Sequence, residues 1–270
     1  QPALFFINSN GEIVKTLRWL KGEGPGEINK ISDFEIINER VYITDVGNFR
    51  WSVFDTLGNF IKSAYPFKDP RKRTSNKHFY GQGNILKNGE SLITCVIEAR
   101  FNRELNQDKS NSMAVLDTSL NIIKVFGFMD DIYGKFRLYN SGSVITSDDA
   151  GSIYFSQKSS YKIYKYNKEG IFIKSFGIKG KFRETEEDIP GNLSYSEIQK
   201  RSKNCSGTMG LFYSSKGYIL YYFTDLTDAF YDTRDPTKRI NYLKIYDTQG
   251  NYLKSDLILP GCPLALNDNN

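Results

Sequence analysis

The chain repeats one pattern of apolar and polar residues. An alternating apolar run is followed by Asp or Asn, by two residues and usually Gly, and by a second short run ending near Lys-Ser. Alternation with a period of two is typical of half-buried β-strands, and the Asx-x-x-Gly segment supplies the turn of a β-hairpin. In one copy Leu120 replaces the Gly, and we expect Asn121 to adopt the left-handed conformation instead. The five copies are residues 4–16, 52–63, 114–125, 163–175 and 242–255.

The spacing of the copies indicates a propeller blade. The anchoring Asp or Asn stands at positions 8, 55, 117, 167 and 247, at intervals of 47, 62, 50 and 80 residues. A period near 50 is the length of a blade with insertions. The longer intervals contain the polar stretches 101–112, 181–206 and 225–238, and residues 195–201 are expected to form one or two helical turns.

Two further strand-like runs precede each hairpin. In the best-preserved unit they are residues 31–37 and 40–45, joined by a short turn at Asn38-Glu39. Four antiparallel strands per repeat are the composition of a propeller blade. The similar pairs are 84–86 with 91–94, 143–146 with 152–155, and 208–212 with 218–222.

Both ends of the chain fall within a blade. The sequence opens on a hairpin and closes on residues 263–267, which are typical of the start of an inner strand. Two arrangements fit this pattern. In the first, the two ends complete one shared blade of a five-bladed ring. In the second, the ring has six blades and some of its strands lie outside this sequence. The pattern therefore predicts a single all-β domain over residues 1–270, a β-propeller of four-stranded antiparallel blades.

One unit resembles an NHL-type repeat. Its entry loop reads Gly-Pro-Gly-Glu within residues 22–28, residues 45–50 read Asp-x-x-Asn-x-Arg, and residues 53–58 contain Phe-Asp-x-x-Gly. The resemblance is strong over residues 17–63 and is reduced elsewhere to the hairpin: Gln157 stands where the Asp would be in one blade, and another lacks the Asn and Arg. It implies a six-bladed propeller, similar to exported bacterial six-bladed propeller proteins that are often lipoproteins.

Composition narrows the class of protein more than its activity. Hydrophobic residues make up 39% and charged residues 25%, and the aromatic share of 14% favours β-structure. The net charge is +5, but acidic residues are interleaved with the basic ones, so we interpret the basic run 68–73 as a solvated loop and do not favour nucleic-acid binding. No apolar run is long enough to span a membrane. Because the chain starts at Gln1-Pro2 without Met, we expect a processed or trimmed N-terminus. The resemblance to exported propeller proteins implies an extracytoplasmic location, in the periplasm or at the cell surface, with a lipid anchor on a segment outside this sequence as one form of it.

Residue types that support catalysis or metal binding are scarce. His78 is the only histidine, and the surrounding lysines indicate an exposed loop. Asp148-Asp149-Ala150-Gly151 is interpreted as a hairpin turn and not as a cation site. The three cysteines have no zinc spacing: Cys95 lies in an apolar run and is expected in the core, and a disulfide between Cys205 and Cys262 is left open. We therefore predict no catalytic residue, no metal and no cofactor.

The candidate ligand-binding residues lie on predicted loops and strand ends, where binding residues concentrate on a rigid scaffold. For Arg50 we favour a structural role, in which Asp45 and Asn48 cap a turn that Arg50 holds, over a ligand contact. The candidates are Arg50, Glu98, Arg100, Arg103, Arg137 and Tyr139.

Three functions fit this sequence. The first is an exported monomeric binding or scaffold propeller that recognises a peptide, a glycan or a partner protein on one face. The alternative is a propeller lyase or hydrolase that uses carboxylates and a divalent metal. The second alternative is nucleic-acid binding through the basic loop 68–77.

Overall fold

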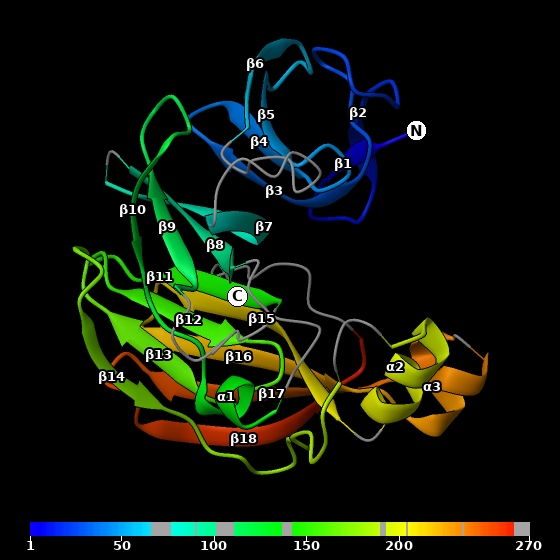
Figure 1. Ribbon diagram of the computed structural model, residues 1–270, viewed down its shortest axis with the longest axis vertical. Coiled ribbons are helices and arrows are strands. Elements are labelled where there is room, and N and C mark those ends of the chain that lie inside the picture. Colours follow the sequence, from blue (N-terminus) through cyan, green and yellow to red (C-terminus); the bar gives the residue numbers. More distant parts are fainter. Residues whose placement is uncertain are drawn as a thin grey trace. The chain divides into compact units, whose positions relative to one another are not determined.

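The computed structural model describes residues 1–65, 77–89, 91–100, 111–136, 142–189, 193–203, 205–233 and 235–261 (Figure 1). Of residues 77–84, 97–100, 195, 199 and 236 it describes the backbone only. The chain divides into two compact units, one from residues 1–105 with 113–125 and the other from residues 106–112 with 126–270.

The first unit contains ten strands among the described residues. They are β1 (Ala3–Ile7), β2 (Ile13–Arg18), β3 (Ile31–Ile37), β4 (Arg40–Asp45), β5 (Arg50–Asp55), β6 (Phe60–Ala64), β7 (Lys77–Asn88), β8 (Ser91–Arg100), β9 (Met113–Leu116) and β10 (Ile122–Phe126).

The second unit combines strands with short helices. Its elements are α1 (Asp131–Lys135), β11 (Ser143–Ser147), β12 (Ile153–Gln157), β13 (Ile163–Tyr166), β14 (Phe172–Phe176), α2 (Tyr195–Ser202), β15 (Ser206–Ser214), β16 (Tyr218–Asp225), α3 (Asp228–Thr233), the 3-10 helix η2 (Pro236–Lys238), β17 (Ile240–Asp247) and β18 (Tyr252–Leu259).

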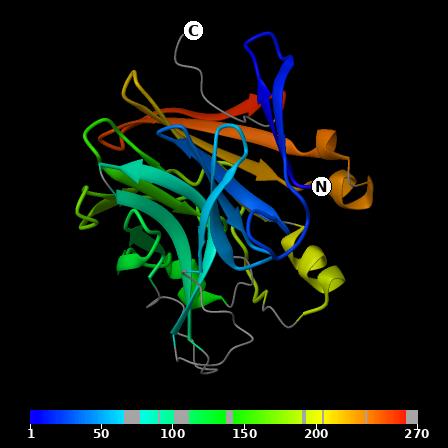
Figure 2. The ribbon, with the colours of Figure 1, turned by 90° about the horizontal axis from the view of Figure 1, so that it is seen from above.

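The described strands form four four-stranded sheets and one two-stranded sheet. Their orders are β3-β4-β5-β6, β10-β9-β8-β7, β11-β12-β13-β14, β15-β16-β17-β18 and β1-β2, and Figure 2 shows the β1-β2 hairpin in dark blue. Each four-stranded sheet is a meander of consecutive strands, so the chain is an all-β propeller with four-stranded antiparallel blades, as predicted. The prediction of six blades is not confirmed, because the described strands complete four blades and β1-β2 supply only one hairpin of a further blade.

The Asp/Asn-x-x-Gly segments all form the same hydrogen-bonded turn. In the second copy the N–H of Gly58 donates to the carbonyl of Asp55 at 3.0 Å. The Asp55 carboxylate accepts the N–H groups of Leu57 at 2.9 Å and of Asn59 at 2.8 Å. The matching carbonyl bonds start from Gly11, Leu120, Gly170 and Gly250. The five predicted hairpins are therefore confirmed.

The turn without Gly differs from the prediction in one residue. Leu120 itself adopts the left-handed conformation, with φ of 70°, and Asn121 does not. A left-handed Leu costs about 1–2 kcal/mol of backbone strain. The Leu120 side chain is fully buried in the core, which offsets that strain, and Asn121 instead donates from its amide to Asp117 at 3.0 Å.

In three of the hairpins, the lysine near the end links neighbouring blades. Lys62 Nζ donates to the Thr118 carbonyl in the turn of the following hairpin. Lys15 donates to the Thr56 carbonyl in the same way, and Lys174 donates to the Gln249 carbonyl. The recurring Lys-Ser ending thus satisfies turn carbonyls of the next repeat.

Apolar side chains fill the layers between blades. On one face of the β3-β6 blade, Val41, Ile43 and Phe54 pack with Leu4 and Leu17 of the β1-β2 hairpin. On the opposite face a second cluster joins this blade to the β7-β10 blade through Ile37, Tyr42, Trp51 and Val53. β3 lies beside β7, and β11 lies beside β15. The first strands of adjacent blades therefore meet, as is typical of the inner strands of a propeller.

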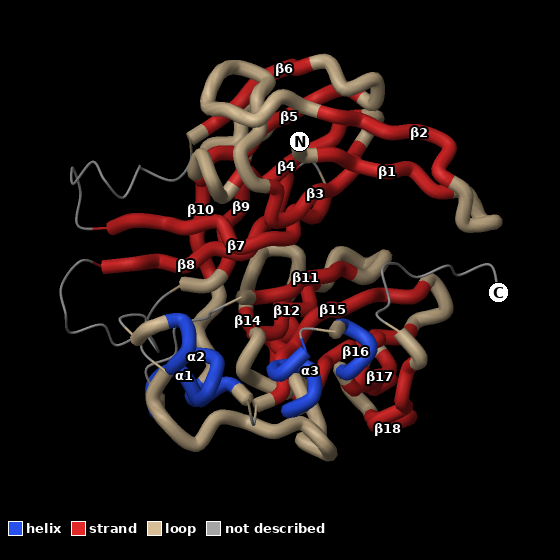
Figure 3. The backbone as a smooth tube through the Cα atoms, turned by 90° about the vertical axis from the view of Figure 1, so that its right-hand side faces the viewer, coloured by secondary structure: helices blue, strands red, loops and turns tan. Residues whose placement is uncertain are grey.

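The helices, blue in Figure 3, occur in the second unit among the described residues. α2 confirms the predicted helical insertion, and Ser194 and Glu197 form a capping box at its start. α1, α3 and η2 were not predicted, because helices of three to six residues are too short to show a periodic pattern. No described helix is long and apolar enough to cross a membrane.

Candidate functional site

The Asp-x-x-Asn-x-Arg segment holds the entry loop of its own blade. Asp45, the last residue of β4, is fully buried and accepts the N–H groups of Asn29 at 3.2 Å and of Lys30 at 2.9 Å. The Asn48 amide donates to Asp45 and to the Gly22 carbonyl, both at 2.7 Å. These bonds fasten the loop before β3 to the end of β4.

Arg50 completes this clamp from inside the protein. Its side chain is 1% exposed, and its Nε lies 3.7 Å from Asp45 Oδ2. One terminal nitrogen donates to the Glu23 carbonyl at 2.9 Å and to the Tyr65 hydroxyl at 3.1 Å. The other donates to the carbonyls of Gly24, at 2.9 Å, and Glu27. These contacts give Arg50 a structural role in the entry loop, while its contact with a ligand stays a prediction.

Other blades use the same position differently. The second strands of their sheets end at Gln157 and Asp225. Gln157 accepts the N–H of Asp130 at 2.5 Å, and Asp225 accepts the Ser206 hydroxyl and pairs with Arg183 Nε at 3.4 Å. In these two blades, which lack the rest of the NHL-like pattern, the second strand therefore still ends in a side chain whose oxygen accepts a hydrogen bond.

Five of the six predicted ligand-binding residues lie where the structure describes no side chain. Glu98 and Arg100 lie in β8, where they pair with Phe79 and Lys77, and only their backbone is described. The remaining candidates, Arg103, Arg137 and Tyr139, lie outside the described residues, as do residues 66–76 of the basic loop.

The placement of the lone histidine in a loop was wrong. His78 belongs to β7, where its backbone pairs with Ala99 of β8. The strands β7 and β8 are longer than the apolar runs from which they were predicted, because their backbone pairing continues through the flanking polar residues. The described backbone therefore places His78 in a sheet.

Two other sequence interpretations are confirmed. Asp148 to Gly151 form the turn between β11 and β12, with a bond of 2.9 Å from the Gly151 N–H to the Asp148 carbonyl. Cys95 is a fully buried free thiol. Cys205 is also a free thiol, so the disulfide alternative is not formed, and Cys262 lies outside the described residues.

A pair of carboxyls on β3, which the sequence analysis missed, is the stronger candidate site. Asp33 and Glu35 are two residues apart and lie directly opposite Thr44 and Tyr42 of β4. Opposite residues of an antiparallel pair share a face, so both carboxyls lie on the face that packs towards the β7-β10 blade. They therefore stand on an inner strand, on its core-facing side.

Partial burial perturbs both groups. Burial raises the pKa of Asp33 from 3.8 to about 6, against a smaller lowering by the Phe34 backbone N–H. Burial and then the Asp33 charge raise the pKa of Glu35 from 4.5 to about 7. Water still reaches Glu35, which is exposed, whereas Asp33 is half-buried. Two accessible carboxyls with raised pKa values are typical of functional sites.

In β3 the acidic residues face the core and apolar residues face outward, which is the reverse of the usual pattern and explains why the sequence analysis missed this pair. Phe34 and Ile36, on the opposite face, are 43% and 41% exposed. The register also shifts between Ile31 and Asp33, at a bulge. Apolar alternation alone predicts that Phe34 and Ile36 face the core. The sequence therefore shows two acidic residues at positions 33 and 35, but it does not show that both carboxyls lie on the core-facing side of the strand.

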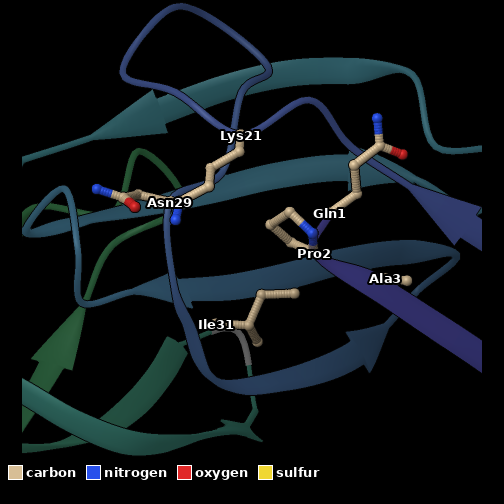
Figure 4. A pocket seen from close by; sticks show the side chains of 6 residues that line it. All are labelled: Gln1, Pro2, Ala3, Lys21, Asn29 and Ile31. Atoms are coloured by element: carbon tan, nitrogen blue, oxygen red, sulfur yellow. The ribbon is translucent and has the colours of Figure 1, made fainter.

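A separate hollow lies beside the start of β1. It has a volume of about 390 Å³ and is lined by Gln1, Pro2, Ala3, Lys21, Asn29 and Ile31 (Figure 4). Its lining holds one ionisable side chain, Lys21, and no carboxyl. A binding site usually combines an apolar wall with several convergent polar groups, so this hollow is a weaker candidate than the Asp33–Glu35 pair.

The described residues contain no group of three His, Cys, Asp or Glu side chains that could hold a metal ion. Asp33 and Glu35 would supply at most two protein ligands there. The paired carboxyls can accept hydrogen bonds when ionised and donate them when protonated.

Comparisons with known proteins support the fold. No family model and no curated protein sequence matches the chain. The chain is similar over 93% of its length to the structure of a DUF4221 family member from Bacteroides vulgatus, with 10% identity, a TM-score of 0.67 and 73% of that chain covered.

Two further solved structures are similar at lower scores. A putative exported protein from Bacteroides fragilis is matched over 92% of this chain and 63% of its own, with 15% identity and a TM-score of 0.50, so this chain spans less than two thirds of that protein. Virginiamycin B lyase from Staphylococcus aureus is matched over 83% of this chain and 70% of its own, with 12% identity. The TM-score of this match is 0.40.

Proposed function

We propose that this protein is an exported binding propeller in which Asp33 and Glu35 contact the ligand. The observation that supports the proposal is the pair of half-buried to exposed carboxyls on inner strand β3, both with raised pKa values. The ligand classes remain a peptide, a glycan or a partner protein, and the carboxyl pair selects those that bring ammonium, guanidinium or hydroxyl donors.

The physical reason is the incomplete solvation of the two groups. Desolvation disfavours the ionised form, so a donor from a ligand gains more at these carboxyls than at a fully hydrated one. At neutral pH Asp33 is largely ionised, and Glu35, with a pKa of about 7, is divided between its two forms. The pair therefore carries one to two negative charges and suits a cationic or hydroxyl-rich group.

Conservative variants test the proposal. Wild-type protein is screened on arrays of glycans and of basic peptides, and each binder is measured again with Asp33→Asn and Glu35→Gln. We expect each variant to weaken binding by about tenfold, as for the loss of a hydrogen bond to a charged group. Glu39→Gln, in the exposed turn of the same blade, is the matched control and should bind normally. Binders that tolerate both site variants would contradict the proposal.

A second candidate is a lyase or hydrolase that uses the same carboxyls. Their pKa values of about 6 and about 7 suit a general base and a general acid near neutral pH. Metal analysis of the purified native protein separates the candidates: a stoichiometric divalent metal, lost together in Asp33→Asn and Glu35→Gln, would favour the enzyme.

Nucleic-acid binding through residues 68–77 stays the third prediction. These residues carry the basic run but lie outside the described side chains. Binding to the phosphate backbone falls steeply with salt. A filter-binding titration at two salt concentrations tests it, and no retention at the lower salt would exclude it.

The location and the complete ring are also proposed. The fold similarity to a putative exported protein supports an extracytoplasmic location, and a lipid anchor stays a prediction from the resemblance in sequence. Cell fractionation tests the location, and labelling with a radioactive fatty acid tests the anchor. The NHL-like unit supports a six-bladed ring, to which the described strands contribute four complete blades and the β1-β2 hairpin. An experimental structure of the natural chain with another blade number would refute it.

A further inference from the structure

Two cations from different blades lie at one end of the β15-β18 sheet. Lys158 follows β12, and its side chain lies across Gly207, where an added Cβ would stand 3.5 Å from Lys158 Cε. Its carbonyl accepts the N–H of Thr208 at 2.8 Å. Arg239 directly precedes Ile240, which opens β17 and pairs with Asp225, the partner of Ser206 in β15. Gly207 and Arg239 therefore lie at the same end of one sheet.

Neither charge is neutralised within the described part of the chain. The ion pairs there include neither Lys158 nor Arg239. Asp225, the carboxylate at this end of the sheet, is already occupied by Arg183 and the Ser206 hydroxyl. Among the residues that the structure describes, the two cations are thus left without an anionic partner of their own.

The surroundings orient both cations. The Arg239 guanidinium lies over the Phe230 ring, 4.2 Å from its centroid, and its Nε is buried without a hydrogen-bond partner in the described structure. The Lys158 stem is held against Gly207. Burial lowers the pKa of Lys158, and the like charge of Arg239 lowers it further.

We propose that Lys158 and Arg239 form a binding site for an oxyanion, a carboxylate or phosphate group of a ligand. A planar guanidinium beside an ammonium matches the oxygens of such a group, and charge-assisted hydrogen bonds are about twice as strong as neutral ones. A bound anion also removes the repulsion between the two cations. The site is independent of Asp33 and Glu35, because it lies in the other unit.

Inorganic anions probe the site directly. Thermal unfolding is followed in chloride, acetate, sulfate and phosphate at one ionic strength, and phosphate binding is measured by line broadening in phosphorus NMR. We expect at least one oxyanion to raise the unfolding temperature above its value in chloride. The best anion then distinguishes a carboxylate ligand from a phosphate or sulfate ligand. Equal temperatures in all four salts, with no line broadening, would overturn the proposal.

Variants locate the effect. Lys158→Met keeps the stem over Gly207 and removes the charge, and Arg239→Met is its counterpart. Each should weaken oxyanion binding by about tenfold, as for one hydrogen bond to a charged group. Lys158→Met should also unfold at a higher temperature than wild type in chloride, because the like-charge repulsion is gone. Lys254→Met, at an exposed lysine of β18, is the matched control. Oxyanion stabilisation that survives in Lys158→Met would refute the site, and this variant decides the outcome if Arg239→Met does not fold.

Discussion

Replacing Asp33 by Asn should make the stability of the first unit depend less on pH. The folded pKa of Asp33, about 6, exceeds the unfolded value of 3.8, so the folded state binds more protons between about pH 4 and pH 6. Stability from this group is complete below pH 4 and is lost as pH rises through 6. An asparagine side chain at this position cannot ionise, so the Asp33→Asn variant escapes that loss.

The size of the effect follows from the shift. About two pKa units correspond to about 3 kcal/mol, which is the upper limit for the gain of Asp33→Asn over wild type at pH 8. At pH 4 the gain should vanish. Glu35 titrates together with Asp33, so the transition should spread over the range from about pH 5 to pH 7. Because water reaches Glu35 more freely, the expected change in the free energy of unfolding is based on Asp33 alone.

Urea unfolding followed by tryptophan fluorescence measures this difference. The two tryptophans, Trp19 and Trp51, both lie in the first unit, and Trp51 is fully buried on the carboxyl-bearing face of the blade. The fluorescence signal therefore reports the unit that contains Asp33. Free energies of unfolding for wild type and variant are compared at pH 4, 5, 6, 7 and 8.

Asp55→Asn serves as a control of opposite sign. The Asn59 amide and backbone N–H groups lower the pKa of Asp55 below 3.8, so its stabilisation is present above that pH and is lost on acidification. Asp55→Asn should be less stable than wild type at pH 7, with the gap closing towards pH 3. A difference for Asp33→Asn that stays constant from pH 4 to pH 8 would refute the assignment of Asp33 as a desolvated carboxyl.

Three further changes have defined outcomes. Arg50→Met leaves the buried Asp45 carboxylate without its ion pair and should lower the free energy of unfolding by about 3 kcal/mol or more in urea titrations, whereas a neutral result would contradict the clamp. Leu120→Gly relieves about 1–2 kcal/mol of left-handed backbone strain but removes a buried side chain that contributes about 2–5 kcal/mol. Calorimetry should therefore show a net loss of stability, and a gain in stability would mean that the strain dominates. Burial lowers the pKa of Lys244 to about 8 against 10.5 unfolded, so the stability contributed by this residue rises with pH between those values. Thermal unfolding followed by circular dichroism should show the stability of Lys244→Met falling relative to wild type between pH 7.5 and pH 10, and a pH-independent difference would exclude the shift.

Local chemistry explains why the hairpins were predictable. An Asp or Asn five residues before the start of the next strand accepts backbone N–H groups of its own turn, as Asp55 does, and this bonding needs no distant partner. The Asn38-Glu39 turn is similar: both residues have positive φ, as a two-residue hairpin turn requires. Leu120 was the exception, because its left-handed conformation is stabilised by burial between two blades in addition to the hydrogen bonds of its own turn.

The candidate site was not predictable in the same way. Asp33 and Glu35 are visible as charges in a strand, but their raised pKa values depend on the protein packed around β3. Lys158 and Arg239 are 81 positions apart in the sequence, so their proximity follows only from the packing of one blade against the next. Conversely, Arg50 drew attention by its motif, and its donors proved to be used by backbone carbonyls.

The sequence by itself determined the repeat unit, the hairpin turns and the propeller class, because period-two alternation and turn bonding act over a few residues. The tertiary structure alone decided how many blades the described strands complete, which face of β3 is buried, and which charges are desolvated or left unpaired. These properties arise where blades pack on one another, and desolvation there depends on residues that the chain brings together from distant repeats.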